Sequence, residues 1–302
     1  MTPREGRPRT GLTPALGAAI GCAVIWGVNV PVMKAGLQEV DPFFFNAARL
    51  TLSAVALGLL DAAERRGRPA PPTPWRRVVL LGLLSSLVYQ VLFLVGMDAT
   101  SAGNTAIIVS SGPLWTAVIE RVMGVDRHSL RAWGALAVAF IGTLLVTLTG
   151  IDDPAGGASL FGNLVMLAAM GTWAFASVLS RPLLETFPAT RLAFLAVLVS
   201  LPGHWVLAAP RLDLAAVERP LFVALAIAYS GVLSTGIAYS LWNRSVKDLG
   251  AARTAAFSNL VPVVALTVAW LFLHEAPRPL QLTGGALVVV GLLMWRTVRR
   301  AT

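Results

Sequence analysis

Ten stretches of this chain run for 17 to 27 residues with no charged residue, or with one, and they fill most of its 302 residues. A helix needs about 20 mostly apolar residues to cross the ~30 Å hydrocarbon core of a membrane. It also pairs its own backbone N–H and C=O groups, which lipid cannot do. The chain is therefore predicted to be an all-α integral membrane protein with ten transmembrane helices. The stretches are Thr10–Met33, Pro42–Leu60, Val78–Met97, Ala99–Ile119, Ala132–Ile151, Pro154–Ser180, Leu192–Pro210, Pro220–Asn243, Thr254–His274 and Pro279–Trp295.

The composition excludes an ordinary soluble domain, because 56% of the residues are hydrophobic and only 13% are charged. A net charge of +9 would suit a nucleic-acid-binding protein. However, the basic residues stand between the apolar stretches and form no continuous stripe, so no nucleic-acid partner is expected. Cys22 is the only cysteine, so no disulfide can form within the chain.

Most of the 24 arginines and lysines fall on one side of the predicted membrane, if successive helices alternate in direction. By the positive-inside rule, both termini then lie in the cytoplasm, as residues 1–11 and 299–302. Only Lys34 and Lys247 are lysines. This preference for arginine, with abundant alanine, is typical of a GC-rich bacterial genome. We therefore expect a multi-pass protein of the bacterial inner membrane.

The two halves of the chain resemble each other at a nearly constant spacing, which indicates an internal repeat. The predicted repeats are residues 12–150 and 151–298, with five helices each. Because five is odd, the second repeat must enter the membrane upside down, which is a transporter architecture. An offset of 149 residues aligns Thr105 with Thr254, Pro113 with Pro262, Asp126 with Glu275 and Gly142 with Gly291, and an offset of 147 aligns Trp26 with Trp173.

Several stretches also carry a family resemblance. They are AVIWGVNVPVMKAGL, FNAARL, GMDATSAGNTAIIVSSGPLWTAV and DLGAARTAAFSNLVPVVALTVAWLFLHEAPRPLQLTGGALVVVGLL. In these residues the chain resembles the EamA-type transporters of the drug/metabolite transporter superfamily, over about residues 12–298. The resemblance implies the fold and transport more closely than the substrate. Bacterial transporters of this kind export amino acids and related metabolites, while others carry sugars, nucleotide-sugars or amphiphilic drugs.

The candidate substrate site consists of polar and aromatic residues inside the predicted helices. Such side chains are costly against lipid, so they are expected to face a cavity or another helix. Alternatively, their hydroxyl and amide groups hold helices together without touching a substrate. The expected cavity residues are Trp26, Asn29, Met33, Tyr89, Gln90, Asn104, Ser111, Trp115, Trp173, Ser177, Tyr229, Tyr239, Ser258 and Asn259.

Four further residues have two interpretations each. Pro113 and Pro262 interrupt the hydrogen-bond ladder of their helices and are candidate hinges, or passive kinks. Arg49 lies well inside an apolar stretch and could pair with a substrate carboxylate, but a structural role is the favoured interpretation. His204, near the outer end of its stretch, is expected to be an interfacial or packing residue.

Together these features predict a transporter that exports small polar metabolites, most readily amino acids, by alternating access to a cavity between the halves. The alternatives are an exporter of amphiphilic drugs or other metabolites, and a non-transporting membrane scaffold. The sequence holds no HExxH, P-loop or GxSxG motif, so we expect no enzyme activity, no cofactor and no metal. The expected partners are the substrate and the lipid bilayer, and the glycine-rich fifth and tenth helices could form a homodimer.

Overall fold

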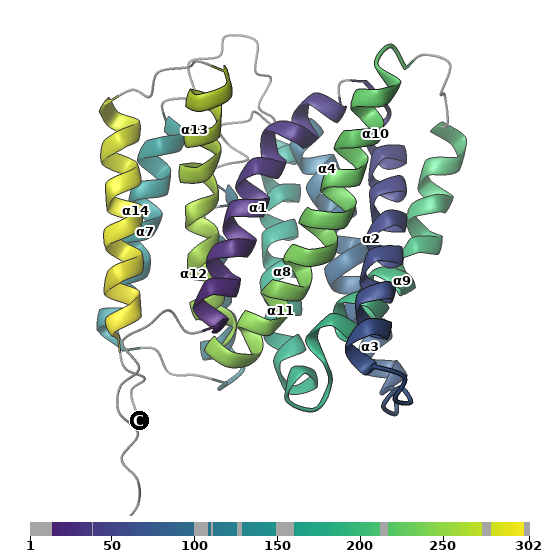
Figure 1. Ribbon diagram of the computed structural model, residues 1–302. Coiled ribbons are helices and arrows are strands. Elements are labelled where there is room, and N and C mark those ends of the chain that lie inside the picture. Colours follow the sequence, from purple (N-terminus) through teal and green to yellow (C-terminus); the bar gives the residue numbers. More distant parts are fainter. Residues whose placement is uncertain are drawn as a thin grey trace, which may run out of the picture.

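The computed structural model describes residues 14–37, 39–99, 108–109, 111–125, 129–148, 160–211, 217–273 and 279–298. Within these ranges every regular element is a helix, and the helices pack into one bundle (Figure 1). Asn104 of the expected cavity and the loop residues Asp126 and Glu275 lie outside the described residues.

The helices follow the apolar stretches of the sequence, and several of them change helical type along their length. Two segments are π-helical and two are short 3₁₀ turns. In chain order the elements are α1 Pro14–Leu37, α2 Pro42–Arg65, α3 Trp75–Gly82, η1 Leu83–Val88 (π), α4 Tyr89–Ala99, α6 Gly112–Val122, α7 Leu130–Leu148, α8 Leu160–Thr186, α9 Ala189–Ala208, η2 Ala209–Arg211 (3₁₀), α10 Pro220–Ala228, η3 Tyr229–Ile237 (π), α11 Ala238–Leu249, α12 Ala251–Ala256, η4 Phe257–Asn259 (3₁₀), α13 Leu260–Leu273 and α14 Pro279–Thr297.

Length and composition identify membrane-crossing candidates among these helices. In the described part of the chain, five are long and apolar enough to cross a membrane. They are Pro42–Arg65, Trp75–Gly96, Phe161–Thr186, Ala189–Arg211 and Pro220–Leu249. Shorter apolar helices include Pro14–Asn29, Leu130–Leu145 and Leu282–Trp295. An all-helical protein of this kind satisfies its backbone hydrogen bonds within each segment, as lipid requires.

Helix α2 begins at a residue that caps its free N–H groups. The Asp41 carboxylate accepts hydrogen bonds from the backbone N–H groups of Phe43 (2.9 Å) and Phe44 (3.2 Å). Pro42 follows at the first helical position, where its missing N–H costs nothing. The helix ends at Arg66, whose φ of 49° is the left-handed conformation typical of a helix C-terminus.

Replacing Asp41 by alanine is expected to lower the free energy of unfolding by about 1 kcal/mol, because two N–H groups at the start of α2 lose their acceptor. Asp41→Asn keeps an acceptor oxygen at the same place and is expected to stay close to the wild type. Thermal unfolding of the purified protein in detergent measures both variants. Equal losses in the two variants would contradict the capping role.

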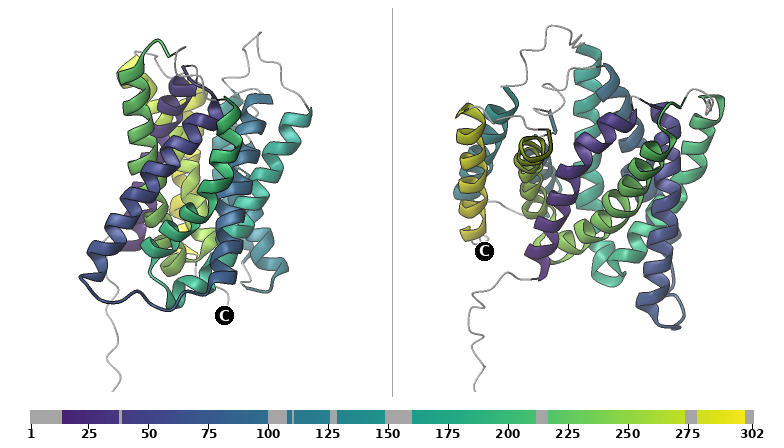
Figure 2. Two further views of the ribbon diagram at one scale, coloured as in Figure 1. Left: turned by 90° about the vertical axis from the view of Figure 1, so that its right-hand side faces the viewer. Right: turned by 45° about the horizontal axis from the view of Figure 1, so that its top comes forward.

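The helices pack in pairs that join the first half of the chain to the second. Helix α2 packs against α9, and α7 packs against α14. Figure 1 shows these two pairs near opposite edges of the bundle, and the right-hand view of Figure 2 shows α7 beside α14 again. Between them, α1 packs on α11 and α13, while α8 packs on α4 and α6.

Helices α7 and α14 meet with their backbones almost in contact. A Cβ atom on Gly142 would lie 2.6 Å from the backbone oxygen of Gly284 and 2.6 Å from the backbone nitrogen of Val288. A Cβ atom on Gly291 would lie 2.6 Å from the backbone nitrogen of Ala139. Small residues allow such close approach of helices in membranes. These glycines therefore form the α7–α14 contact within the chain, whereas the sequence alone leaves open whether they serve a dimer.

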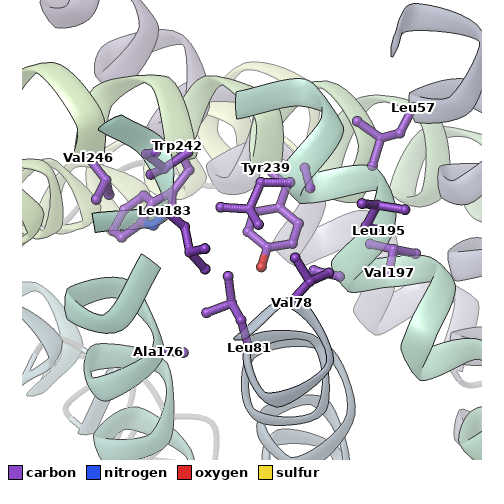
Figure 3. Packing of buried hydrophobic residues seen from close by; sticks show 14 of the residues in the cluster. Leu57, Val78, Leu81, Ala176, Leu183, Leu195, Val197, Tyr239, Trp242 and Val246 are labelled. Atoms are coloured by element: carbon purple, nitrogen blue, oxygen red, sulfur yellow. The ribbon is translucent and has the colours of Figure 1, made fainter. Parts of the chain in front are cut away.

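A buried apolar cluster fills the space between α2, α3, α8, α9 and α11. Figure 3 shows Leu81 beneath Tyr239, with the tyrosine hydroxyl pointing into the space beside Val78. Leu183 and Val246 lie near Trp242 in the same cluster. This packing surrounds Tyr239 and Trp242 with buried apolar side chains.

Ion pairs lie at both ends of α2. At its C-terminal end, one oxygen of Asp61 accepts from Arg191 on α9 (2.9 Å) and from Arg65 (3.2 Å). Near its N-terminal end, Glu39 after α1 accepts a hydrogen bond from the Arg219 side chain, just before α10 (Nε to Oε1, 3.1 Å). The Arg219 guanidinium lowers the pKa of the Glu39 carboxyl through this hydrogen bond. The Asp61–Arg191 and Glu39–Arg219 pairs join residues of the first half of the chain to residues of the second.

Candidate functional site

Four aromatic rings from three helices surround that of Trp173 on a fourth, and we refer to these five rings as the aromatic cluster. They belong to Trp26 on α1, Tyr89 on α4, Trp173 on α8, and Tyr239 and Trp242 on α11. The Trp173 ring is central, with its centroid 5.8 Å from that of Trp26 and 4.9 Å from that of Tyr89. The centroids of Tyr239 and Trp242 lie 5.9 and 5.3 Å from it. Tilted and edge-on rings at these separations attract one another.

The sequence predicts four of these residues for the cavity, and the structure brings all four together. Trp242 was missed. Its spacing from Tyr239 could have identified it as a site residue, because a residue three positions further along a helix lies on the same face. Trp242 also contacts Trp26 directly, with centroids 5.2 Å apart.

Hydrogen bonds to the two π-helical segments hold the cluster in place. The Trp26 indole N–H donates to the backbone oxygen of Ser234 in η3 (3.0 Å). The Tyr239 hydroxyl donates to Oγ of Ser85 in η1 (2.7 Å). A π-helical turn departs from the regular hydrogen-bond ladder, and such turns are frequent at functional sites.

A small cavity lies against the aromatic cluster. Its free space is about 10 Å³, roughly the room that one water molecule needs. Asn243 is 2% exposed, and its Nδ2 has no hydrogen-bond partner among the described residues. The cavity thus has polar groups in its lining and is too small for a metabolite in this conformation. It is lined by Leu81, Ser85, Trp173, Ala176, Ser177, Ser180, Tyr239, Trp242 and Asn243.

Arg49 on α2 is only 4% exposed, and neutral groups accept all of its hydrogen bonds. Its Nε donates to Asn46 Oδ1 (2.9 Å) on the same helix. Nη1 donates to Thr235 Oγ1 in η3 (2.7 Å), and Nη2 donates to Gln90 Oε1 on α4 (2.8 Å). The sequence predicted Gln90 for the site but not Asn46 or Thr235, because no local pattern connects three separate helices.

His204 is part of the same network, and of its two interpretations from the sequence, interfacial or packing, its burial agrees with packing. It is buried, and its Nε2 lies 2.7 Å from the backbone oxygen of Ser86. A carbonyl oxygen only accepts, so Nε2 carries the proton and donates. Nδ1 is then the acceptor for the Asn46 amide nitrogen, 3.1 Å away. This order of bonds leaves the Asn46 oxygen free to accept from Arg49.

Other expected cavity residues bind neighbouring helices. Asn29 on α1 accepts a hydrogen bond from the Ser230 hydroxyl (2.6 Å), and Tyr229 donates to the backbone oxygen of Ile25 (3.2 Å). Met33 lies elsewhere, in an apolar cluster with Phe45, Val40, Val223 and Ala226. The structure therefore separates Met33 from the polar and aromatic groups.

The described residues expected from the fourth and ninth stretches make no hydrogen bond or ring contact with the aromatic cluster. Ser111 donates to the backbone oxygen of Ile108 (2.5 Å). Trp115 is 38% exposed and makes no ring contact with the described aromatic residues. Ser258 is half-buried, in the 3₁₀ turn η4. Asn259 is buried beside it, and in the described part of the chain neither of its side-chain polar atoms has a partner.

The two candidate hinge prolines occupy equivalent places. Pro113 lies in the first turn of α6, and Pro262 lies in the first turn of α13 directly after η4. A proline in the first turn removes an N–H that has no partner within the helix. The hinge role of these residues stays a prediction.

A family model described as the EamA-like transporter family matches the chain twice, over residues 13–148 and 160–297. A solved structure described only as a crystal structure of a protein has a similar fold. Its TM-score is 0.80 at 17% identity, and the match covers 94% of this chain and 96% of that one.

Curated relatives match over nearly their full length. A probable terminal-alkyne amino-acid exporter of Streptantibioticus cattleyicolor is 28% identical, over 94% of this chain and 93% of the relative. A probable amino-acid metabolite efflux pump of Escherichia coli is 26% identical, over 92% and 95%. The uncharacterized transporter YoaV of Bacillus subtilis is 25% identical, over 91% and 94%.

Proposed function

The chain belongs to the EamA-like transporter family, and on that premise we propose that it exports small polar metabolites, most readily amino acids, by alternating access. Transport is the activity that the family and the relatives' names share. The substrate class and the mechanism are our proposal.

The proposed architecture is ten membrane-spanning helices in two inverted halves, residues 12–150 and 151–298. The helix contacts support it, because α1 packs on α11 and α13 just as α8 packs on α4 and α6. The π-helical segments also support it. An offset of 149 residues carries η1 onto residues 232–237, which lie within η3. Inverted repeats of this kind place a substrate near the membrane midplane, between the halves.

The proposed orientation places both termini in the cytoplasm of a bacterial cell, with the protein in its inner membrane. The distribution of arginine supports this, because the loops after α2, α6, α8 and α11 all fall on the arginine-rich side. The Asp61 ion pairs would then lie near the cytoplasmic surface, and the Glu39–Arg219 pair near the outer one.

One observation carries the transport mechanism: the aromatic cluster is shared between the halves. Trp26 and Tyr89 come from the first half, and Trp173, Tyr239 and Trp242 come from the second. Because the cavity beside them holds about one water, a metabolite can pass only if these rings separate. Relative motion of the two halves would separate them, and this is the step that alternating access requires.

The groups around the aromatic cluster support a polar substrate. Ser177, Ser180 and Asn243, whose Nδ2 has no partner among the described residues, line the cavity together with aromatic rings. Such a lining can bind the polar and apolar parts of an amino acid together. Two of the relatives are named for amino acids or their metabolites.

The test is transport by the purified protein in liposomes, with labelled amino acids, sugars and cationic dyes as separate probes. We expect saturable amino-acid flux, and a loss of about tenfold in Trp173→Ala, equivalent to about 1.4 kcal/mol on the barrier. The matched control is Phe175→Ala, because Phe175 lies on the same helix and is exposed. Flux of dyes alone would show a drug exporter instead, and flux of no probe would favour a scaffold.

A further inference from the structure

We infer that Arg49 binds the carboxylate of the exported substrate, so that the substrate class is carboxylate-bearing metabolites, zwitterionic amino acids among them. This inference rests on the proposed function and adds the group that selects the substrate. It reverses the structural interpretation of Arg49 favoured from the sequence.

Among the residues that the structure describes, no anion contacts the Arg49 guanidinium. Arg49 is buried inside α2, yet its acceptors are the neutral side chains of Asn46, Thr235 and Gln90. Among the described ion pairs, Asp61 and Glu39 serve other arginines at the two ends of the helix. A buried cation without an anion is costly in a membrane protein, and such residues mark substrate or ion pathways.

The guanidinium group of Arg49 has N–H bonds that its present acceptors do not use. It offers five N–H bonds in a planar fork, of which Nη1 and Nη2 carry two each. Thr235 and Gln90 each accept one of these, so each nitrogen keeps one further N–H. These two remaining N–H bonds are the donors available to a substrate carboxylate.

A chain of hydrogen bonds fixes the orientation of the Arg49 guanidinium group. Nε is held by Asn46, whose amide orientation is in turn set by His204 and the backbone oxygen of Ser86. Asn46 and His204 are therefore positioning residues. They fix the position of Nε, while Nη1 and Nη2 donate to acceptors on other elements.

The acceptors of Arg49 are sequence neighbours of residues that form or hold the aromatic cluster. Gln90 follows Tyr89, whose ring stacks on Trp173, and Thr235 follows Ser234, which holds Trp26. Gln90 belongs to the first half and Thr235 to the second. A movement that opens the aromatic cluster would therefore act on both acceptors of the guanidinium group, and a substrate carboxylate could replace Thr235 on Nη1. The rest of the substrate would then lie against the aromatic rings.

The inference is tested in the same liposomes by comparing acids with their amides. The probes are labelled L-phenylalanine, L-leucine and L-threonine, each against its carboxamide, which keeps the amino group and the side chain but lacks the negative charge. Through the wild type we expect each transported acid to move at least about tenfold faster than its amide, since a lost charge-assisted contact exceeds about 1.4 kcal/mol.

The variants assign this preference to Arg49. In Arg49→Gln the ratio of acid to amide flux is expected to fall toward one, and Arg49→Lys, which keeps the charge without the fork, is expected to lie between. Arg211→Gln is the control, because Arg211 is an exposed arginine on η2. Size-exclusion chromatography and thermal unfolding establish that each variant is folded.

The outcomes separate this inference from the proposed function. Equal transport of acids and amides by the wild type would overturn the role of Arg49 but leave amino-acid export in place, and it requires no variant. A folded Arg49→Gln protein that still prefers acids would do the same. Absence of flux for every acid and amide would overturn both proposals.

Discussion

Gly142→Val is expected to unfold at a much lower temperature than the wild type, with a loss of about 3 kcal/mol in the free energy of unfolding. The new Cβ would lie 2.6 Å from two backbone atoms of α14, and backbone cannot move aside as a flexible side chain can. Helices α7 and α14 would have to separate along their length, and their mutual contact is extensive. Thermal unfolding in detergent measures the loss.

The same helix provides the control for this prediction. Gly134 on α7 is exposed, and a Cβ atom added to it would have no neighbouring atom within 4 Å. Gly134→Val therefore changes helix propensity equally but creates no clash, so its unfolding temperature should stay near that of the wild type. Gly291→Val should match Gly142→Val, because its Cβ would meet the backbone of Ala139. Similar behaviour of Gly142→Val and Gly134→Val would contradict the close contact.

Asp61→Asn is the second change with a large expected effect, again about 3 kcal/mol. Asp61 is 2% exposed and accepts from both Arg191 and Arg65. The amide would leave Arg191 largely buried without an anion, between α2 and α9. Breaking a buried ion pair from one side is more costly than removing both partners, because an uncompensated charge remains.

A double variant tests this reasoning. The loss in free energy of unfolding in Asp61→Asn combined with Arg191→Gln should be smaller than the sum of the losses in the two single variants. Neither charge is then left without its partner. Asp248→Asn is the control, since Asp248 is an exposed carboxylate at the end of α11. Strict additivity of the Asp61 and Arg191 variants would show that the pair contributes nothing beyond its separate groups.

The sequence predicted an all-helical membrane protein of this family correctly, because uncharged runs of about 20 residues leave few other structures possible. It also predicted Trp26, Tyr89, Trp173 and Tyr239 as residues of one site, and they form one cluster. Met33 shares a helical face with Trp26, but seven residues place it about 10 Å further along the axis. At that height it meets an apolar cluster.

The remaining features depend on contacts between helices that no local pattern encodes. The network of Arg49 joins α2 to η3 and α4, and His204 joins it from α9. The π-helical segments were not predicted either, because one added residue per turn barely alters the apolar periodicity. Asp61 directly follows an apolar stretch in the sequence, and its burial follows only from the packing of α9 against α2.

The two helix pairs at opposite edges of the bundle, α2 with α9 and α7 with α14, restrict how the molecule can move (Figure 1). Each pair joins one half to the other, so a rigid rotation that preserves both contacts must turn about a line running from edge to edge through the bundle. Such a rotation widens one end of the interface between the halves while it narrows the other. The packing at the periphery would thus keep the protein from ever being an open pore.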